Sequence, residues 1–260
     1  MSAKSKVLVT GASSGIGAIY ADRFARRGHD LVLVARDAAR LQTLAERLRR
    51  ETDVGVEILP ADLTKAEDLA KVEAKLAGDA AIGTLINNAG VAALGGFLGQ
   101  SGQVAADLIA LNVTALTRLA AAVAPRFVAA GKGEIVNISS VVGFAPELGM
   151  TVYGATKAYV TYLSQGLALE LGPKGVYVQA VLPAATRTEI WGKSGVDVNQ
   201  LEGVMEVGEL VDAALVGYDR REAITIPPLP DAAQWDAYEA ARVAMLPNLR
   251  QPHAAARYRG

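Results

Sequence analysis

The feature that most constrains this chain is a glycine-rich turn placed directly after a short apolar run near its start. The apolar run at residues 7–9 precedes the sequence Thr-Gly-Ala-Ser-Ser-Gly-Ile-Gly at residues 10–17. This order predicts a buried strand, a tight turn and a helix whose first N–H groups face an anion. Its glycines permit the turn and the close approach of a diphosphate. Because a glycine-rich loop alone is weak evidence, the prediction of a dinucleotide site depends on the rest of the chain.

Apolar runs and amphipathic stretches alternate along the remaining sequence. Further strands are predicted within residues 30–35, 56–59, 84–86, 135–138, 176–182 and 223–226. Helical spacing fills the intervals, and its longest stretches are about 103–130 and 153–171. The pattern predicts an α/β fold with one Rossmann-like, doubly wound, mostly parallel sheet of about seven strands and helices on both faces. We expect a single domain over residues 1–260, with a C-terminal extension at about 227–260.

Composition argues against several classes of function. The 260 residues carry a formal net charge of −1, so no strong field would attract nucleic acid or anionic lipid. The chain has no cysteine and only two histidines, His29 and His253, which argues against a thiol nucleophile and a metal site. Residues 1–6 are polar, and the apolar stretch 108–130 contains asparagine, threonine, arginine and proline. We therefore expect a cytoplasmic protein without a membrane span.

Polar and small residues follow four of the predicted strands. They are Thr10–Gly17, Ala61–Leu63, Asn87–Gly90 and Ser139–Ser140. The carboxyl ends of parallel strands meet at one edge of a sheet, so these segments are expected to surround one crevice.

A tyrosine and a lysine stand four residues apart at the start of the helix predicted after the fifth strand. Tyr153 and Lys157 would share one face of that helix. Lowering a tyrosine pKa from about 10 to about 7 takes roughly 4 kcal/mol. A cation at about 4 Å supplies about that much at an effective dielectric near 20, and a cation at about 6 Å supplies about 3 kcal/mol. The pair can therefore act as an acid/base unit when a second positive charge or a helix N-terminus helps; on its own it could also be an exposed surface pair.

Together these motifs resemble the short-chain dehydrogenase/reductase (SDR) family from about Lys6 to Thr188. The residues that carry the resemblance are Thr10–Gly17, Asp62, Asn87–Gly90, Asn112, Ser140, Tyr153, Lys157, Pro183 and Thr188. One departure is Ala184, where the family usually has glycine after the proline.

The resemblance implies a catalytic tetrad of Asn112, Ser140, Tyr153 and Lys157. Ser140 would hydrogen-bond the substrate oxygen, and Tyr153 would transfer its proton while hydride moves to or from a nicotinamide. Lys157 would lower the pKa of the tyrosine and hold the nicotinamide ribose. Asn112 would help to hold a water that links the lysine to solvent, although an ordinary polar role within its helix is the alternative.

The resemblance also implies which residues bind the cofactor. They are Gly11, Ser13, Ser14, Gly15, Ile16, Gly17, Arg36, Asp62, Leu63, Asn88, Ala89, Gly90, Tyr153, Lys157, Pro183 and Thr188.

The end of the second predicted strand favours NADP(H). Ala35 stands where NAD-preferring relatives carry aspartate, and Arg36 after it suits a 2′-phosphate, with Arg40 nearby. Asp37 keeps NAD(H) as the alternative, because a turn could bring its carboxylate toward the ribose. Asp62 would bond the adenine amino group.

The segment at about 187–207 is expected to fold over the active site as a substrate lid. Apolar residues at 141, 142, 144, 148, 190 and 191 predict a largely apolar pocket, although they could equally pack the lid on the sheet. The expected substrate contacts are Ser140, Val142, Tyr153, Ile190 and Trp191.

The predicted activity is the NADP(H)-dependent reduction of a bulky or aromatic ketone or aldehyde. An NAD-dependent alcohol dehydrogenase of the same fold and a catalytically idle NADP(H)-binding regulatory protein are the alternatives. Relatives commonly pair through the two long helices, so the resemblance implies a homodimer or homotetramer.

Overall fold

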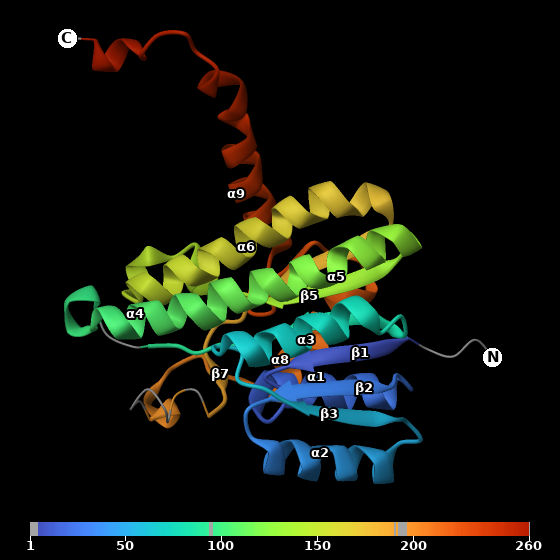
Figure 1. Cartoon of the computed structure of the whole chain (residues 1–260). Helices are drawn as coiled ribbons and strands as arrows, with labels where there is room; N and C mark the ends of the chain where they lie inside the picture. The colour runs from blue at the N-terminus through green and yellow to red at the C-terminus, as the bar shows by residue number, and fades with distance from the viewer. Residues whose placement is uncertain (1–4, 94–95, 190, 192–196, 260) are drawn as a thin grey trace. The chain divides into compact units, whose positions relative to one another are not determined.

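The computed structural model describes residues 5–93, 96–189, 191 and 197–259, and its core is one seven-stranded parallel sheet (Figure 1). The strands are β1 (Lys6–Thr10), β2 (Leu31–Ala35), β3 (Val56–Pro60), β4 (Ile82–Asn87), β5 (Gly133–Ile138), β6 (Val176–Val181) and β9 (Ile224–Thr225). Their order is β3-β2-β1-β4-β5-β6-β9, so the direction of winding reverses between β1 and β4. The expected doubly wound fold is confirmed, and its ligand crevice is placed at the carboxyl ends of these two strands.

Helices cover both faces of the sheet (Figure 1). One face packs against α1 (Gly15–Arg26), α2 (Ala38–Glu51) and α8 (Val207–Asp219). The other packs against α3 (Ala66–Gly78), α5 (Leu116–Ala130) and the end of α6 (Thr151–Leu171).

Alternate side chains of a strand enter the cores on opposite faces of the sheet. Val7 and Val9 of β1 enter the first core, and Leu8 between them enters the second. All three are fully buried. Alternate side chains of a strand point to opposite faces, so a strand covered on both sides is apolar throughout, as β1 and β2 are.

A π-helical turn interrupts the long helix predicted over about 103–130. The structure has α4 (Gly102–Ile109), the π-turn Ala110–Ala115 and then α5. Apolar spacing predicted the length of this region but not its wider turn, which lies at Asn112.

The run Gly102–Ala130 is also long and apolar enough to cross a membrane by length and composition. Leu119, Val123 and Phe127 of this run are nevertheless buried in the core beside β4 and β5. A core helix of a globular protein can be equally long and apolar. The buried contacts of Leu119, Val123 and Phe127 place Gly102–Ala130 in the core in this way.

Short elements complete the chain. Two two-residue strands, β7 (Thr186–Arg187) and β8 (Met205–Glu206), form a separate parallel pair that the sequence did not predict. The 3₁₀ helices are Phe97–Gly99, Val141–Gly143, Pro146–Leu148, Gly172–Lys174, Val198–Gln200, Leu246–Leu249 and Ala256–Tyr258.

The chain divides into two compact units, residues 1–227 and 228–260. The second unit contains α9 (Ala232–Ala244). The Asp231 carboxylate begins this helix by accepting a hydrogen bond from the Ala233 N–H at 2.9 Å.

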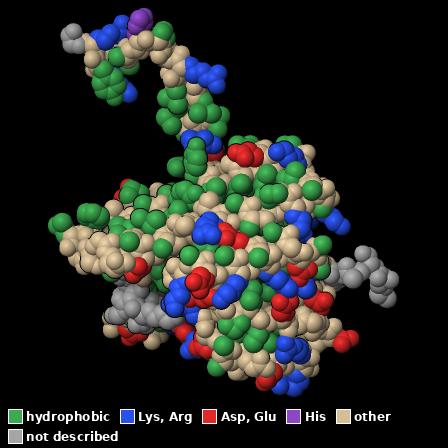
Figure 2. Space-filling model, in the orientation of Figure 1, with side chains coloured by type: hydrophobic (Ala, Val, Ile, Leu, Met, Phe, Trp, Pro, Cys, Tyr) green, Lys and Arg blue, Asp and Glu red, His purple; other side chains and the backbone are tan. Residues whose placement is uncertain are grey.

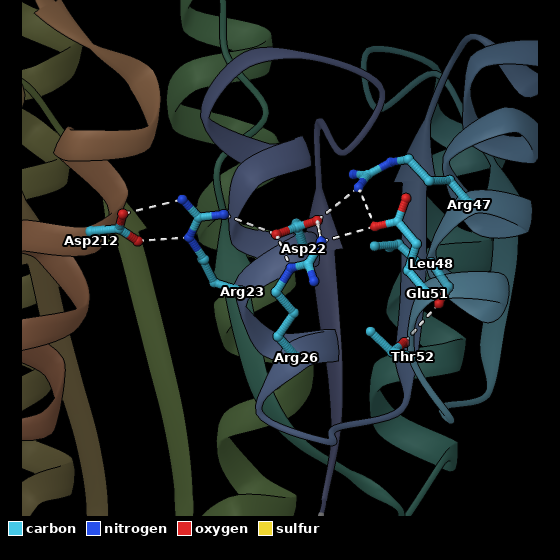
Figure 3. Close-up of polar contacts among 8 residues, drawn as sticks. All are labelled: Asp22, Arg23, Arg26, Arg47, Leu48, Glu51, Thr52 and Asp212. Carbon is cyan, nitrogen blue, oxygen red and sulfur yellow. Dashed lines mark hydrogen bonds and ion pairs between the residues drawn. The ribbon is translucent and has the colours of Figure 1, made fainter.

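A buried carboxylate ties α1 to its neighbours (Figure 3). Asp22 is 3% exposed and accepts hydrogen bonds from Arg23, Arg26 and Arg47, each at 2.9 Å. Burial alone would raise the pKa of Asp22, but the three guanidinium groups lower it below its usual value. Arg23 also holds Asp212 of α8 at 2.6 Å, so this cluster joins α1, α2 and α8.

We expect Asp22→Asn to lower the free energy of unfolding by about 1–3 kcal/mol at pH 7, because three cations lose their common partner. The stability that Asp22 contributes is present above its unfolded pKa of about 3.9 and falls as pH drops below it. Urea unfolding at pH 7 and pH 3.5 measures both effects. Equal stability of variant and wild type at pH 7 would contradict the assigned role.

Candidate active site

One pocket of about 1070 Å³ lies at the carboxyl ends of the strands, where the winding reverses. It extends from Arg36, after β2, to Ser140, Tyr153 and Trp191. The predicted cofactor residues that line it are Gly11, Ser13, Ser14, Gly15, Ile16, Arg36, Asp62, Leu63, Asn88, Ala89, Gly90, Tyr153, Lys157, Pro183 and Thr188. Gly17 is the remaining predicted residue, and it lies behind the pocket wall. A Cβ at Gly17 would come within 2.4 Å of the Gly11 carbonyl oxygen, so its role is close packing.

The turn between β1 and α1 fits the diphosphate of a dinucleotide. Gly11 has a φ of +66°, and a Cβ there would lie 2.7 Å from the Asn88 amide nitrogen. In the described structure, the side chain of the N-cap residue Ser14 makes no hydrogen bond to α1. The first N–H groups of α1 are therefore left to an anion, which the positive end of the helix favours.

The Thr10 hydroxyl holds the two loops of the crevice together. Its oxygen accepts hydrogen bonds from the Asn88 and Ala89 N–H groups, both at 3.0 Å, and donates to the Ile86 carbonyl at 3.3 Å. The Asn88 side chain returns a bond to the Thr10 carbonyl at 2.9 Å. Thr10 belongs to the glycine-rich motif, but the sequence pattern did not predict this bridge between β1 and β4.

Charged groups gather at the end of the pocket beyond β2. Asp62 accepts hydrogen bonds from the Thr64 hydroxyl and N–H. Burial alone would raise the pKa of Asp62, but these bonds and the charge of Arg36 lower it. Asp37 caps α2 by accepting from the Arg40 N–H at 2.9 Å, although it also lines the pocket.

Ser140, Tyr153 and Lys157 share the opposite end of the pocket. The Ser140 hydroxyl donates to the Pro183 carbonyl at 3.1 Å. Lys157 Nζ lies 5.6 Å from the centre of the Tyr153 ring and donates to the Ile138 carbonyl at 2.8 Å. The neighbouring serine, Ser139, donates to the Lys157 carbonyl at 2.7 Å and so holds α6.

Burial sets the protonation of the tyrosine and the lysine. It raises the pKa of Tyr153 to about 12, although a hydrogen bond with Ser140 acts in the opposite direction. It lowers the pKa of Lys157 to about 8. The loss of water around the phenol is the larger of these two effects, so the pKa of Tyr153 lies above its usual value in the protein alone. Acidification of Tyr153 by Lys157 together with a second positive charge stays a prediction.

Asn112 lies beside the pocket and joins two of its walls. Its side chain accepts from the Val91 N–H at 3.0 Å and donates to the Val91 carbonyl at 2.8 Å. It also donates to the Thr156 hydroxyl at 3.2 Å, and that hydroxyl donates to the Tyr153 carbonyl at 2.7 Å. The side chain therefore links the loop after β4 to the helix that carries Tyr153 and Lys157.

Apolar side chains surround the pocket near Tyr153. They include Val142, Leu148, Met150, Trp191 and Leu201. The Trp191 indole N–H donates to the Thr186 carbonyl at 2.7 Å, which fixes the ring against β7.

The sequence made further predictions for the pocket near Tyr153, and the structure describes only some of the residues concerned. Ile190 lies outside the described residues, as do residues 192–196 of the expected lid. Phe144 is 40% exposed and is absent from the described pocket wall. Leu201 lies within the expected lid and lines the wall, whereas Met150, which also lines it, was not predicted, because the sequence gives no sign of how the 3₁₀ turns fold back. Among the described residues, no group of three or more His, Asp or Glu could hold a metal ion.

Comparison with known proteins identifies the class that this fold and pocket define. Residues 5–199 match the family model for short chain dehydrogenase. The chain is 35% identical over 187 residues to very-long-chain 3-oxoacyl-CoA reductase-A of Danio rerio, covering 70% of this chain and 58% of the relative. It is 34% identical over 184 residues to 17-beta-hydroxysteroid dehydrogenase type 3 of Mus musculus, covering 70% and 60%. The chain thus spans about 60% of the length of these curated relatives.

Two solved structures match over almost the whole chain. A short-chain dehydrogenase from Sphingobium yanoikuyae in complex with NADPH is 68% identical, with a TM-score of 0.96 and coverage of 98% of this chain and 99% of that one. The bulky-bulky ketone specific alcohol dehydrogenase from Comamonas testosteroni is 60% identical, with a TM-score of 0.92 and 99% coverage of both chains.

The chain belongs to the short-chain dehydrogenase family. The predicted family and oxidoreductase class are confirmed.

We expect Lys157→Met to raise the free energy of unfolding of the protein alone by about 1–3 kcal/mol at pH 7. The folded pKa of Lys157 lies near 8, below the ordinary lysine value of 10.5. The folded state therefore binds fewer protons than the unfolded state between these values, so wild-type stability rises with pH across this window. The advantage of the variant should disappear near pH 10.5. Denaturant unfolding from pH 7 to 10.5 measures this, and a variant without any advantage at pH 7 would contradict the argument.

Proposed function

We propose that this protein is an NADP(H)-dependent carbonyl reductase that reduces a bulky, largely apolar ketone or aldehyde and, in reverse, oxidises the alcohol. The observation that carries the proposal is the continuity of one pocket from Arg36 to Tyr153 and Trp191. The pocket therefore brings together three features. They are Arg36, a cation suited to a 2′-phosphate, the turn that fits a diphosphate, and Tyr153 as a proton donor.

The two similar structures support both halves of the proposal. The Sphingobium protein binds NADPH, and the Comamonas protein is described as specific for bulky-bulky ketones. The apolar wall formed by Val142, Leu148 and Trp191 suits a substrate of that shape.

Ser140 and Tyr153 would act on the substrate oxygen. The cofactor supplies hydride for reduction and accepts it in oxidation. The Ser140 hydroxyl would orient the carbonyl, and the phenol of Tyr153 would donate a proton to its oxygen. The phenol is protonated at neutral pH, as an ordinary tyrosine is, so the residue carries the proton that reduction requires.

Lys157 and Asn112 would support this proton transfer. Lys157 Nζ lies close to Gly90, where an added Cβ would be 3.7 Å away, so this ammonium would be able to hold the cofactor's ribose beside the loop after β4. Asn112 holds the two walls together through Val91 and Thr156, and the π-turn at this residue alters the usual pairing of its backbone. We propose that a backbone carbonyl of this turn holds the expected water.

Assembly and location are also proposals. Exposed apolar side chains occur on α4 and α6, among them Ile109, Tyr162 and Leu169, and Figure 2 shows hydrophobic side chains gathered around α4–α6. We propose that these helices form the interface of a homodimer or homotetramer. We also propose a cytoplasmic location, which rests on the sequence alone.

We expect Tyr153→Phe to lower kcat for ketone reduction by roughly 10²- to 10⁴-fold, because the proton donor is lost. The dissociation constant for NADPH should stay within about twofold of wild type. Tyr159→Phe is the matched control, since Tyr159 lies on the same helix and its hydroxyl contacts Thr117 at 3.0 Å outside the pocket. Stopped-flow absorbance and a fluorescence titration measure the two quantities. Comparable turnover in Tyr153→Phe would refute the role of the phenol.

We expect Arg36→Ala to reduce the preference for NADPH over NADH by roughly 10- to 100-fold, because a charge-assisted bond to the 2′-phosphate is lost. Arg50→Ala removes the same charge at the other end of α2 and serves as the control. The readout is the ratio of kcat/KM for the two cofactors with one ketone. An unchanged ratio in Arg36→Ala would place phosphate recognition elsewhere.

A further inference from the structure

A bifurcated ion pair joins α2 to the segment that follows β7. Arg40 Nη1 contacts both carboxylate oxygens of Glu189, at 2.8 and 2.7 Å. Arg40 Nε also lies 3.5 Å from the Asp37 carboxylate. The Arg40 guanidinium therefore faces two acidic groups, one from its own helix and one from a segment 149 residues further along the chain.

These groups lie on the wall of the proposed cofactor pocket. Arg36, Asp37, Arg40 and Glu189 all line it, and Glu189 directly follows the cofactor-lining residue Thr188. The negative charges thus stand at the end of the pocket where Arg36 favours a phosphate.

The ion pair between Arg40 and Glu189 is weak enough for a phosphate to replace the carboxylate. The side chains of Arg40 and Glu189 are each half-exposed, so water and salt screen their attraction. A phosphate carries up to two negative charges and three acceptor oxygens, and it competes well for a guanidinium. A carboxylate left beside that phosphate would in addition repel it.

We infer that Glu189 is a specificity-determining residue that competes with the 2′-phosphate of the cofactor for Arg40. This inference rests on the proposed NADP(H) function. When a 2′-phosphate binds, Arg40 exchanges its carboxylate partner for the phosphate. Glu189 thereby weakens the binding of phosphorylated dinucleotides and leaves their non-phosphorylated counterparts almost unaffected, so the preference for NADP(H) is lower than the arginines alone would give.

The test compares Glu189→Gln with wild type by calorimetric titration at low salt. The probes are NADPH, NADH, 2′,5′-ADP and 5′-AMP, and the last two differ only in the 2′-phosphate. Glu206→Gln is the matched control, because Glu206 forms an ion pair with Arg187 at 2.7 Å on the adjoining strand pair and does not line the pocket.

In Glu189→Gln we expect NADPH and 2′,5′-ADP to bind roughly three- to tenfold more tightly. NADH and 5′-AMP should change by less than about twofold, as should all four probes in Glu206→Gln. The gain should shrink at about 0.5 M salt, since the effect is one of screened charges. In an Arg40→Met background the gain should also be smaller, because no guanidinium remains to be released.

Three results would overturn the inference. Unchanged affinity for 2′,5′-ADP would mean that the pair has no role in binding. Weaker binding would mean that Glu189 orients Arg40 for the phosphate instead of competing with it. Equal tightening of 5′-AMP and 2′,5′-ADP would mean that the effect is not specific to the 2′-phosphate. Failure of the proposed function looks different, since wild-type protein would then bind neither NADPH nor 2′,5′-ADP.

Discussion

The site depends on the attachment of α6 to the carboxyl end of β5. Lys157 donates to the Ile138 carbonyl, and Ser139 donates to the Lys157 carbonyl, so strand and helix are joined in both directions. These bonds bring Tyr153 beside Ser140 on one wall of the pocket. The Thr10 hydroxyl joins the two loops on the opposite side of the crevice. Together these few buried polar contacts fix the proposed catalytic groups relative to the glycine-rich turn between β1 and α1.

The burial of Tyr153 and Lys157 affects both the protonation of these groups and the interactions made in the pocket. It raises the pKa of the Tyr153 phenol to about 12 and opposes the charge on Lys157, whose pKa falls to about 8. Apolar surroundings also strengthen interactions with charge that develops on a bound substrate. Burial of Lys157 thus lowers the stability of the protein alone, and the proposed function gives its charge a use when cofactor and substrate are bound. Active sites commonly show this conflict between stability and function.

The sequence predicted the fold and most of the pocket wall, because both follow from local patterns. Doubly buried strands such as β1 and β2 are apolar throughout, and parallel strands bring their carboxyl-end loops to one edge. It did not predict the bridge made by Thr10, the π-turn at Asn112 or the β7–β8 pair, each of which depends on contacts between distant segments. The pairing of Arg40 with Glu189 is of the same kind. Spacing also could not predict that removal of water from the phenol raises the pKa of Tyr153 in the protein alone, because that burial depends on segments distant in the sequence.

The central claim is that Tyr153 and Ser140 act together on one substrate oxygen beside a bound nicotinamide. A crystal structure with NADP⁺ and a bulky alcohol or an inert ketone analogue tests it most directly. The account predicts that Tyr153 Oη and Ser140 Oγ both lie within about 3.2 Å of the substrate oxygen, with the nicotinamide on the same side of the pocket. A substrate oxygen that lies away from both hydroxyl groups while the nicotinamide occupies the pocket would contradict it.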